Sequence, residues 1–350
     1  MLIQTVLFTF GVSVCLCAGD NRVNEVVTKV NDLVSKGDLA YDSIKQVDAF
    51  KTYIVKWNRT YTDDNEIKTR FEYFKQDGKE KDEYYGTSGS SDRSPQEILQ
   101  RTGLRLTGKE KERLEADRER VKKFLNERKK GPLPKSLDWR QSKVKVLNPV
   151  ENQGRCRSCW AFATAAILES QVALFKNALY PLSKSQLVEC DHGSTNAGCS
   201  GGNIDVAFEY VKQYGLESQA DYPYRNKENI TFRCTYEKEK ARVFVQDTWV
   251  TSGVDNMMDL LQSGPIGVYL NHALIASYDG NPIRRNDSTC NPQKLDHHVV
   301  IVGYGEKNGI LTWIVRDSWG DYGPDHGYFQ IERGTNACGI ESYAYLASVK

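Results

Sequence analysis

The stretch NQGRCRSCWAFA, residues 152–163, places two cysteines three positions apart where a glycine-containing loop gives way to an apolar run. The run continues to residue 178 and is rich in alanine, a pattern that predicts a buried helix. Cys159 would open this helix, where the unpaired backbone amides carry partial positive charge and stabilise a thiolate. The stretch therefore predicts a reactive sulfur at a helix N-terminus and leaves the role of Cys156 open.

Two other chemistries use a C-x-x-C pair. A thioredoxin-like redox couple expects a strand before the pair, whereas a glycine-containing loop precedes it here. A zinc site needs a second ligand pair of recognisable spacing, and no further C-x-x-C or H-x3-H follows Cys159. Both stay as alternatives to a single nucleophilic thiol.

The N-terminus predicts export. Residues 1–19 are apolar and uncharged and end in Ala18-Gly19, as in a cleaved secretory signal peptide, with a membrane anchor as the alternative. Of the nine cysteines, Cys15 and Cys17 lie in this segment, and the other seven all follow residue 150. An odd number of cysteines in a secreted chain predicts three disulfides and one remaining thiol.

The residue pattern of the sequence changes near residue 133. Before it, apolar residues recur at helical spacing over 21–35 and 44–85, and a charged helix is predicted over 109–130. The GPLP sequence at 131–134 stops that helix and marks a domain boundary. The net charge of +1 gives no general attraction to nucleic acid or to an anionic membrane, and the basic excess is confined to residues 101–130.

Beyond residue 240, β-branched and aromatic runs separated by turn residues predict strands. The runs are ARVFVQDTWV, GPIGVYL, HVVIVGYG, LTWIVRDSW and GYFQIER. Helices followed by strands predict an α+β domain of two packed halves, with the functional site in the groove between them.

Partners for a Cys159 nucleophile are few, because the chain has five histidines. His297 and His298 begin a predicted strand, where alternation sends their side chains to opposite faces, so only one is expected to meet Cys159. Asp317, at the end of a later strand, is a candidate to orient the imidazole. Gln153 lies six residues before Cys159, and its amide and the Cys159 backbone N–H are candidate donors to an oxyanion.

Taken together, these residues resemble the papain family of cysteine proteases, in a cathepsin L-like precursor. The matching motifs run in family order from residue 133 to 350: LPKSLDWR (133–140), NQGRCRSCWAFA (152–163), LSKSQLVECDHG (182–193), GCSGGN (198–203), DYPY (221–224), GPIGV (264–268), DHHVVIVGYG (296–305), VRDSWG (315–320), HGYFQIERG (326–334) and NACGIES (336–342). The resemblance implies a two-subdomain papain-like fold, with a helical half that contains the cysteine helix and a barrel-like β half.

The resemblance also implies roles for these residues. Cys159 is the nucleophile, Gln153 the oxyanion donor and Asp317 the orienting residue. His297 is the base, because it stands six residues before Gly303, as the family's histidine does. The implied disulfides are Cys156–Cys199, Cys190–Cys234 and Cys290–Cys338, and the implied substrate-binding residues are Arg157, Gly202, Asn203, Ile204, Tyr269, Leu295, Asp296, His298, Trp319 and Tyr343.

The N-terminal region is similar to the family's inhibitory propeptide. Glu66, Arg70 and Phe74 keep the E-x3-R-x3-F spacing, whereas Asp77 and Lys81 depart from the rest of that helical signature. The expected organisation is a signal peptide over 1–19, a helical inhibitory propeptide over 20–132 and a peptidase domain over 133–350.

Two departures fall inside the expected site. Asp317 replaces the family's asparagine, and Arg157 replaces a glycine that lines the cleft. Tyr269, His298 and Tyr343 would make the second subsite shallow or polar. A catalytically impaired papain-fold protein that binds peptides or inhibitors is therefore the alternative to an active endopeptidase.

The resulting hypothesis is a monomeric cysteine endopeptidase zymogen, secreted or delivered to a lysosome or vacuole, that needs no metal or organic cofactor. Its expected partners are protein or peptide substrates, its own propeptide and protein inhibitors of cysteine proteases, with no nucleic acid and no membrane once the signal is removed. Asn58, Asn229 and Asn286 lie in N-x-S/T sequons and are candidate glycosylation sites.

Overall fold

The structure is a computed structural model of the 350-residue chain. It describes residues 21–56, 59–80, 92, 112, 115–116, 132–192, 195–286 and 289–350, with side chains left out at 77–80. The chain divides into two compact units after Gly86. The predicted signal segment 1–19 and most of the predicted 109–130 helix lie outside the described residues.

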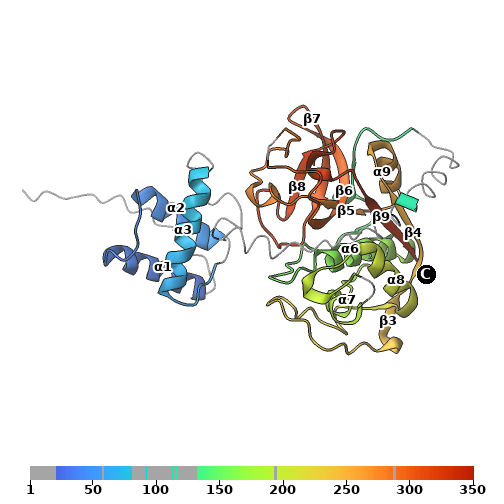
Figure 1. Ribbon diagram of the computed structural model, residues 1–350, viewed down its shortest axis with the longest axis horizontal. Helices are drawn as coiled ribbons and strands as arrows, with labels where there is room; N and C mark the ends of the chain where they lie inside the picture. The colour runs from blue at the N-terminus through green and yellow to red at the C-terminus, as the bar shows by residue number, and fades with distance from the viewer. Residues whose placement is uncertain are drawn as a thin grey trace, which may run out of the picture. The chain divides into compact units, whose positions relative to one another are not determined.

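The described residues of the first unit form three helices, drawn in blue in Figure 1. They are α1 (Asn21–Ser35), α2 (Ile44–Lys56) and α3 (Asp64–Glu80). Their apolar faces form one core that includes Val30, Phe50 and Phe71. The helical pattern predicted over 44–85 is divided, because Asp63 caps the N–H of Glu66 at 2.9 Å and begins a new helix.

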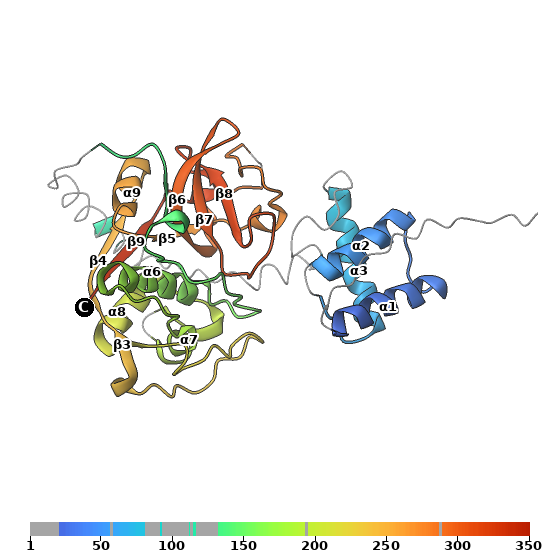
Figure 2. The same cartoon turned by 180° about the vertical axis from the view of Figure 1, so that it is seen from behind.

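The helices of the second unit precede most of its strands. Among the described residues from 132 onwards, the α-helices are α6 (Cys159–Lys176), α7 (Lys184–Cys190), α8 (Ile204–Tyr214) and α9 (Val254–Leu261). Helix α6 is buried on nearly all sides, as its alanine-rich sequence predicts. It packs against β6 and β9 on one side and against α7 and α8 on the other, so that it lies between the sheet and these two helices (Figures 1 and 2).

A seven-stranded antiparallel sheet forms the other half of this unit, in the order β4-β9-β5-β6-β7-β8, with β1 paired to β6. The strands are β1 (Leu137–Asp138), β4 (Val245–Thr251), β5 (Ile266–Leu270), β6 (His297–Lys307), β7 (Ile310–Arg316), β8 (Tyr328–Glu332) and β9 (Ala344–Val349). A separate pair joins β2 (Leu216–Glu217) and β3 (Ala241–Val243). The sheet brings the start of β6 next to the end of β7, and the site is found there.

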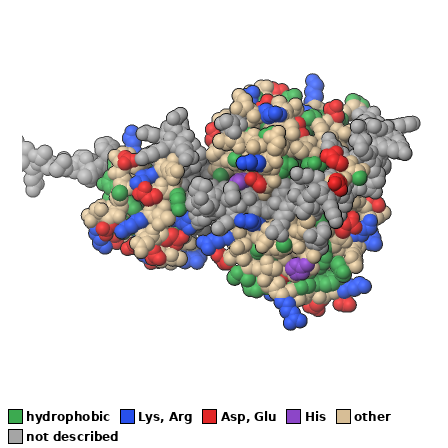
Figure 3. Space-filling view, in the orientation of Figure 1, with side chains coloured by type: hydrophobic (Ala, Val, Ile, Leu, Met, Phe, Trp, Pro, Cys, Tyr) green, Lys and Arg blue, Asp and Glu red, His purple; other side chains and the backbone are tan. Residues whose placement is uncertain are grey.

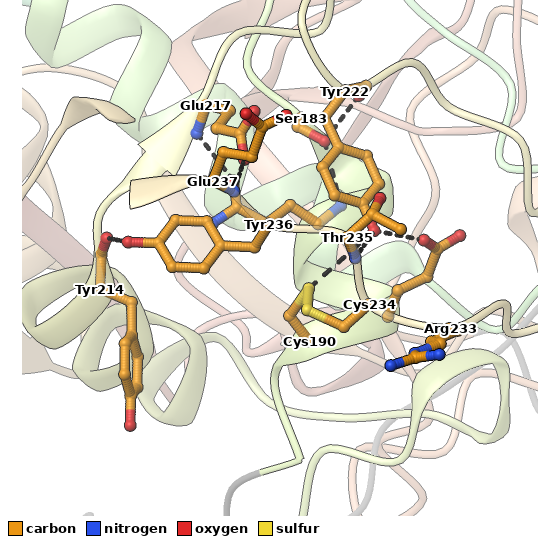
Figure 4. Close-up of a disulfide and its surroundings, with 12 residues drawn as sticks. Ser183, Cys190, Tyr214, Glu217, Tyr222, Arg233, Cys234, Thr235, Tyr236 and Glu237 are labelled. Carbon is orange, nitrogen blue, oxygen red and sulfur yellow. Dashed lines mark hydrogen bonds between the residues drawn. A yellow bond between two sulfur atoms is a disulfide. The ribbon is translucent and has the colours of Figure 1, made fainter. Parts of the chain in front are cut away.

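Three disulfides join the pairs implied by the resemblance: Cys156–Cys199, Cys190–Cys234 and Cys290–Cys338. Figure 4 shows the second of them with Tyr222 beside it. The Tyr222 hydroxyl donates to the buried Glu189 and accepts from the Thr235 N–H at 3.1 Å, while Ser183 donates to the Tyr222 carbonyl at 2.7 Å. These contacts fasten the long loop before β3 to α7.

Charged side chains of both signs are interspersed over the face that Figure 3 presents, in keeping with the net charge of +1. In the described part of the chain, no helix combines the length and apolar character that crossing a membrane requires.

Candidate active site

Cys159 begins α6 and is fully buried. Among the seven cysteines from residue 150 onwards, all of which the structure describes, it is the free one. Cys156 is bonded to Cys199, and the Arg157 N–H donates to the Cys199 carbonyl at 3.1 Å. The redox-couple and zinc interpretations of the C-x-x-C pair are therefore wrong, because the sulfur of Cys156 is already bonded. The bridge instead fixes the loop that presents Cys159.

His297 and Asp317 form a buried pair at the adjacent ends of β6 and β7. The Nε2 atom of His297 lies 2.8 Å from Oδ1 of Asp317, and neither side chain is exposed. Asp317 is fully hydrogen-bonded, because Oδ1 also accepts from the Ser318 N–H at 2.7 Å and Oδ2 accepts from the Tyr322 hydroxyl at 2.6 Å. The carboxylate thus has a donor for each oxygen, as a buried charge requires.

The electrostatics of this pair favour the charged forms of both groups. Burial lowers the pKa of His297, but the charges of Asp317 and Cys159 outweigh it and raise the pKa to about 10. Burial likewise raises the pKa of Asp317, but the attraction of His297 and the hydrogen bonds from His297, Tyr322 and Ser318 hold it below its ordinary value. An imidazolium beside Cys159 is the arrangement that a thiolate nucleophile uses.

Trp319 covers the His297–Asp317 contact. Its ring centroid lies 4.9 Å from that of His297, and the residue is 3% exposed. The ring of Tyr322 also packs against that of Trp319, with centroids 6.1 Å apart. Excluding water in this way strengthens the ion pair, because the surrounding dielectric constant is low.

Gln153 lies in the loop before Cys159 and is fully buried. Its Nε2 donates to the Cys156 carbonyl at 2.7 Å, and its Oε1 accepts from the Ser318 hydroxyl at 2.6 Å. Its backbone N–H donates to the Ser318 carbonyl at 2.9 Å. The side-chain amide is therefore held between the loop of Cys159 and the residue that follows Asp317.

His298 also lies beside the sulfur. Its Nδ1 is 3.4 Å from Sγ of Cys159, while the charge of Cys159 is one of the causes that raise the pKa of His297. The hydrogen-bonding contact with Sγ is thus made by His298, whereas the resemblance implies His297 as the base.

Comparisons with known proteins agree with this geometry. Residues 133–348 match the family described as "Papain family cysteine protease". The chain belongs to the papain family of cysteine proteases. A "Cathepsin L-like proteinase" of Phaedon cochleariae is 42% identical over 225 residues, which are 62% of this chain and 67% of the relative. A "Viral cathepsin" of Lymantria dispar multicapsid nuclear polyhedrosis virus is 34% identical over 86% of this chain and 84% of its own.

A solved structure extends the likeness to the N-terminal region. It is a digestive procathepsin L2 proteinase from the Tenebrio molitor larval midgut, which superposes with a TM-score of 0.71 at 29% identity. The match covers 87% of this chain and 99% of the other. The α+β papain-like fold with a helical N-terminal region is therefore confirmed.

The protease has an aromatic cluster where the sequence predicts its second subsite. Tyr269, on β5, is fully buried, and its ring meets that of His298 edge to face at 4.6 Å. The rings of Tyr343 and Tyr345 lie 6.0 and 5.1 Å from Tyr269. Tyr343 is partly exposed, and its hydroxyl donates to Glu115 at 3.3 Å. Two of the residues predicted to form the second subsite, His298 and Tyr343, thus gather around the buried ring of Tyr269.

The other predicted substrate-binding residues differ in what they contact. Asp296 accepts from the backbone and ring N–H groups of His272, each at 2.9 Å. Asn203 is fully buried, with its side chain donating to Thr195 at 2.9 Å, and Ile204 is fully buried as well. Gly202 lies against the Trp160 ring so closely that an added Cβ would be 2.8 Å from it.

Leu295 and Arg157 are partly exposed. Leu295 packs toward Gly339, where its Cδ2 would lie 2.4 Å from an added Cβ. Within the described residues, the Arg157 guanidinium makes no hydrogen bond or ion pair. A cation with no partner in the described part of the chain therefore lies two residues before Cys159.

Two residues of the site are absent from the sequence-based prediction. Tyr322 holds Oδ2 of Asp317, and Ser318 holds Gln153. Both lie within five residues of Asp317, in the segment after β7. A buried carboxylate such as that of Asp317 requires hydrogen-bond donors. A tyrosine a few residues away in the sequence is therefore the signal by which Tyr322 could have been predicted as a donor.

Proposed function

We propose that this chain is the zymogen of a secreted or lysosomal cysteine endopeptidase in which Cys159 attacks the peptide carbonyl. His297 holds the imidazolium and protonates the leaving amine, Asp317 orients His297, and water then hydrolyses the acyl-enzyme. The proposal rests above all on the 2.8 Å His297–Asp317 pair beside the free thiol. The reaction needs no metal or organic cofactor.

Gln153 and the Cys159 backbone N–H would donate to the tetrahedral oxyanion. The bond from Ser318 to Oε1 supports this role, because it turns the amide group of Gln153 toward the loop of Cys159. One donor of this kind typically contributes a factor of about 10²–10³ to the rate.

The zymogen part of the proposal concerns residues 1–132. Residues 1–19 would direct export, and 20–132 would act as an intramolecular inhibitor until removed, giving a monomeric enzyme from residue 133. The Tenebrio molitor relative, solved as a procathepsin over a comparable length, supports this organisation. Protein inhibitors of cysteine proteases would be further partners, and an extracellular or lysosomal location would follow.

Of the sequons, Asn229 and Asn286 are exposed, which makes them suitable glycan acceptors on this route, while Asn58 lies outside the described residues.

A thiol-directed epoxide tests the nucleophile. The processed protein is expected to gain one label on Cys159, detected by peptide mass spectrometry, and Cys159→Ala is expected to gain none. An unlabelled but correctly folded and processed protein would reject the enzyme proposal and favour the alternative, a papain-fold protein that binds peptides or inhibitors without cleaving them.

Arg157 is proposed to attract an acidic side chain beside the scissile bond, because its guanidinium is partly exposed and lacks a partner among the described residues. We compare peptides that carry either Glu or Gln at the position beside the scissile bond and are otherwise identical. The kcat/KM for the Glu peptide is expected to be roughly 3- to 10-fold higher, and this ratio should decrease at high salt. Arg157→Gly is expected to abolish this preference for Glu. An unchanged Glu/Gln ratio of kcat/KM in that variant would rule out this role.

A further inference from the structure

A second imidazole lies against the sulfur of Cys159. Nδ1 of His298 is 3.4 Å from Sγ, a hydrogen-bonding distance for sulfur, and the two residues are 1% and 0% exposed. Both partners are therefore shielded from bulk water. The contact is separate from the His297–Asp317 pair, because His298 approaches the sulfur with its own ring nitrogen.

His298 is neutral in this setting. Burial lowers its pKa well below the ordinary value, and the charge of His297 lowers it further. A neutral imidazole carries one N–H and one acceptor nitrogen. Nε2 of His298 has no hydrogen-bond partner within the described residues, so nothing there competes with Nδ1 for the proton.

The ring of His298 is also fixed in place. Tyr269 meets it edge to face, with an interplanar angle of 86°, and the backbone of His298 is paired with Tyr269 across β5 and β6. The titratable groups that face it are Cys159 from α6, Tyr269 from β5 and the adjacent His297. A small cavity that His298 lines also has charged side chains in its wall, those of Glu151, Glu169, Lys184, Arg316 and Asp317.

We propose that His298 donates a hydrogen bond from Nδ1 to the Cys159 thiolate, so that the sulfur lies between the imidazolium of His297 and the neutral imidazole of His298. This rests on the proposed role of Cys159 as nucleophile and deepens it. A hydrogen bond to a charged acceptor stabilises the thiolate, which is the nucleophilic form of Cys159. His298 is thereby a catalytic residue as well as part of the second subsite.

Two variants of nearly equal size isolate the hydrogen bond. His298→Asn places an amide N–H close to the position of Nδ1, whereas His298→Leu fills the same space without a donor. The readout is the rate of Cys159 alkylation by iodoacetamide in the processed protein, followed by mass spectrometry as a function of pH. This measurement needs no substrate turnover.

We expect the midpoint of the alkylation profile to rise by about one pH unit in His298→Leu and to stay near the wild-type value in His298→Asn. An unchanged midpoint in a folded Leu variant would overturn the proposal, and so would equal shifts in both variants, which would indicate packing alone. If Leu prevents folding, His298→Ala replaces it in the same comparison. If Cys159 of the wild-type protein does not react with iodoacetamide at any pH, the proposed function is contradicted, and this inference is contradicted with it.

Discussion

Asp317→Ala is expected to lower kcat/KM for peptide hydrolysis by at least about a hundredfold, whereas Asp317→Asn is expected to keep or raise it at acid pH. Alanine removes the acceptor of the His297 Nε2–H, which lies 2.8 Å away in a site closed by Trp319. His297 would then be free to rotate, and a buried donor would have no partner. Asparagine keeps an oxygen at this position.

The fit of asparagine follows from the other contacts of Asp317. Its oxygen would still accept from His297 and from the Ser318 N–H. The amide NH₂ would face Tyr322, whose hydroxyl now donates to Oδ2 but is also able to accept. The hydrogen-bond network is therefore preserved, and only the negative charge is lost.

Loss of that charge sets the direction of the pH dependence. Among the groups that raise the pKa of His297 to about 10, the carboxylate of Asp317 has the largest effect. Without it, His297 loses its proton at lower pH, and activity that depends on the imidazolium falls with it. The alkaline limb of the kcat/KM profile is therefore expected to move to lower pH in Asp317→Asn.

The profiles of wild type, Asp317→Asn and Asp317→Ala, measured with one peptide substrate, check this prediction. Asp325→Asn is a matched control, since Asp325 also accepts from a tyrosine hydroxyl, that of Tyr278 at 2.6 Å, but lies outside the site. It is expected to leave the profile unchanged. A folded Asp317→Asn protein that is inactive at about pH 5 to 6 would show that the carboxylate itself is needed for the chemistry.

The elements that carry the site follow from local sequence pattern. The alanine-rich run after Cys159 can only be buried, and the β-branched runs that became β5, β6, β7 and β8 alternate with turn residues. Strand β9 is not among the predicted strands, since its two alanines have low β propensity, yet it lies between β4 and β5. Pairing with these two neighbouring strands therefore determines the extended conformation of β9.

Contacts between side chains are less predictable, because they depend on where strand ends meet. Nothing in the spacing of His297 and His298 shows that the ring of His298 contacts Cys159. The departure of Asp317 from the family's residue raises a question that the sequence leaves open, and the structure supplies Tyr322 as the donor for the additional oxygen. Charge at a buried position can be assessed only when its partners are known.

Lys184→Met is expected to destabilise the second unit by about 3–5 kcal/mol, because it leaves a buried carboxylate without its cation. Lys184 and Glu169 are each 2% exposed, with Nζ 3.2 Å from Oε1. The same ammonium group also pairs with Glu151 and lies 3.2 Å from Oε1 of Gln219. Glu169 would keep its bonds from the Leu182 N–H and the Asn148 amide but would lose the compensating charge.

Thermal unfolding of the processed protein measures this effect. At about 2–4 °C for each kcal/mol, the Tm is expected to fall by roughly 10 °C. The matched control is Lys240→Met, whose partner Glu237 is exposed, and it is expected to leave the Tm unchanged. Adding Glu169→Gln to Lys184→Met removes the stranded charge and is expected to recover part of the loss. An unchanged Tm in Lys184→Met would mean that water or a rearranged side chain compensates Glu169, and that the ion pair does not hold α7 to α6.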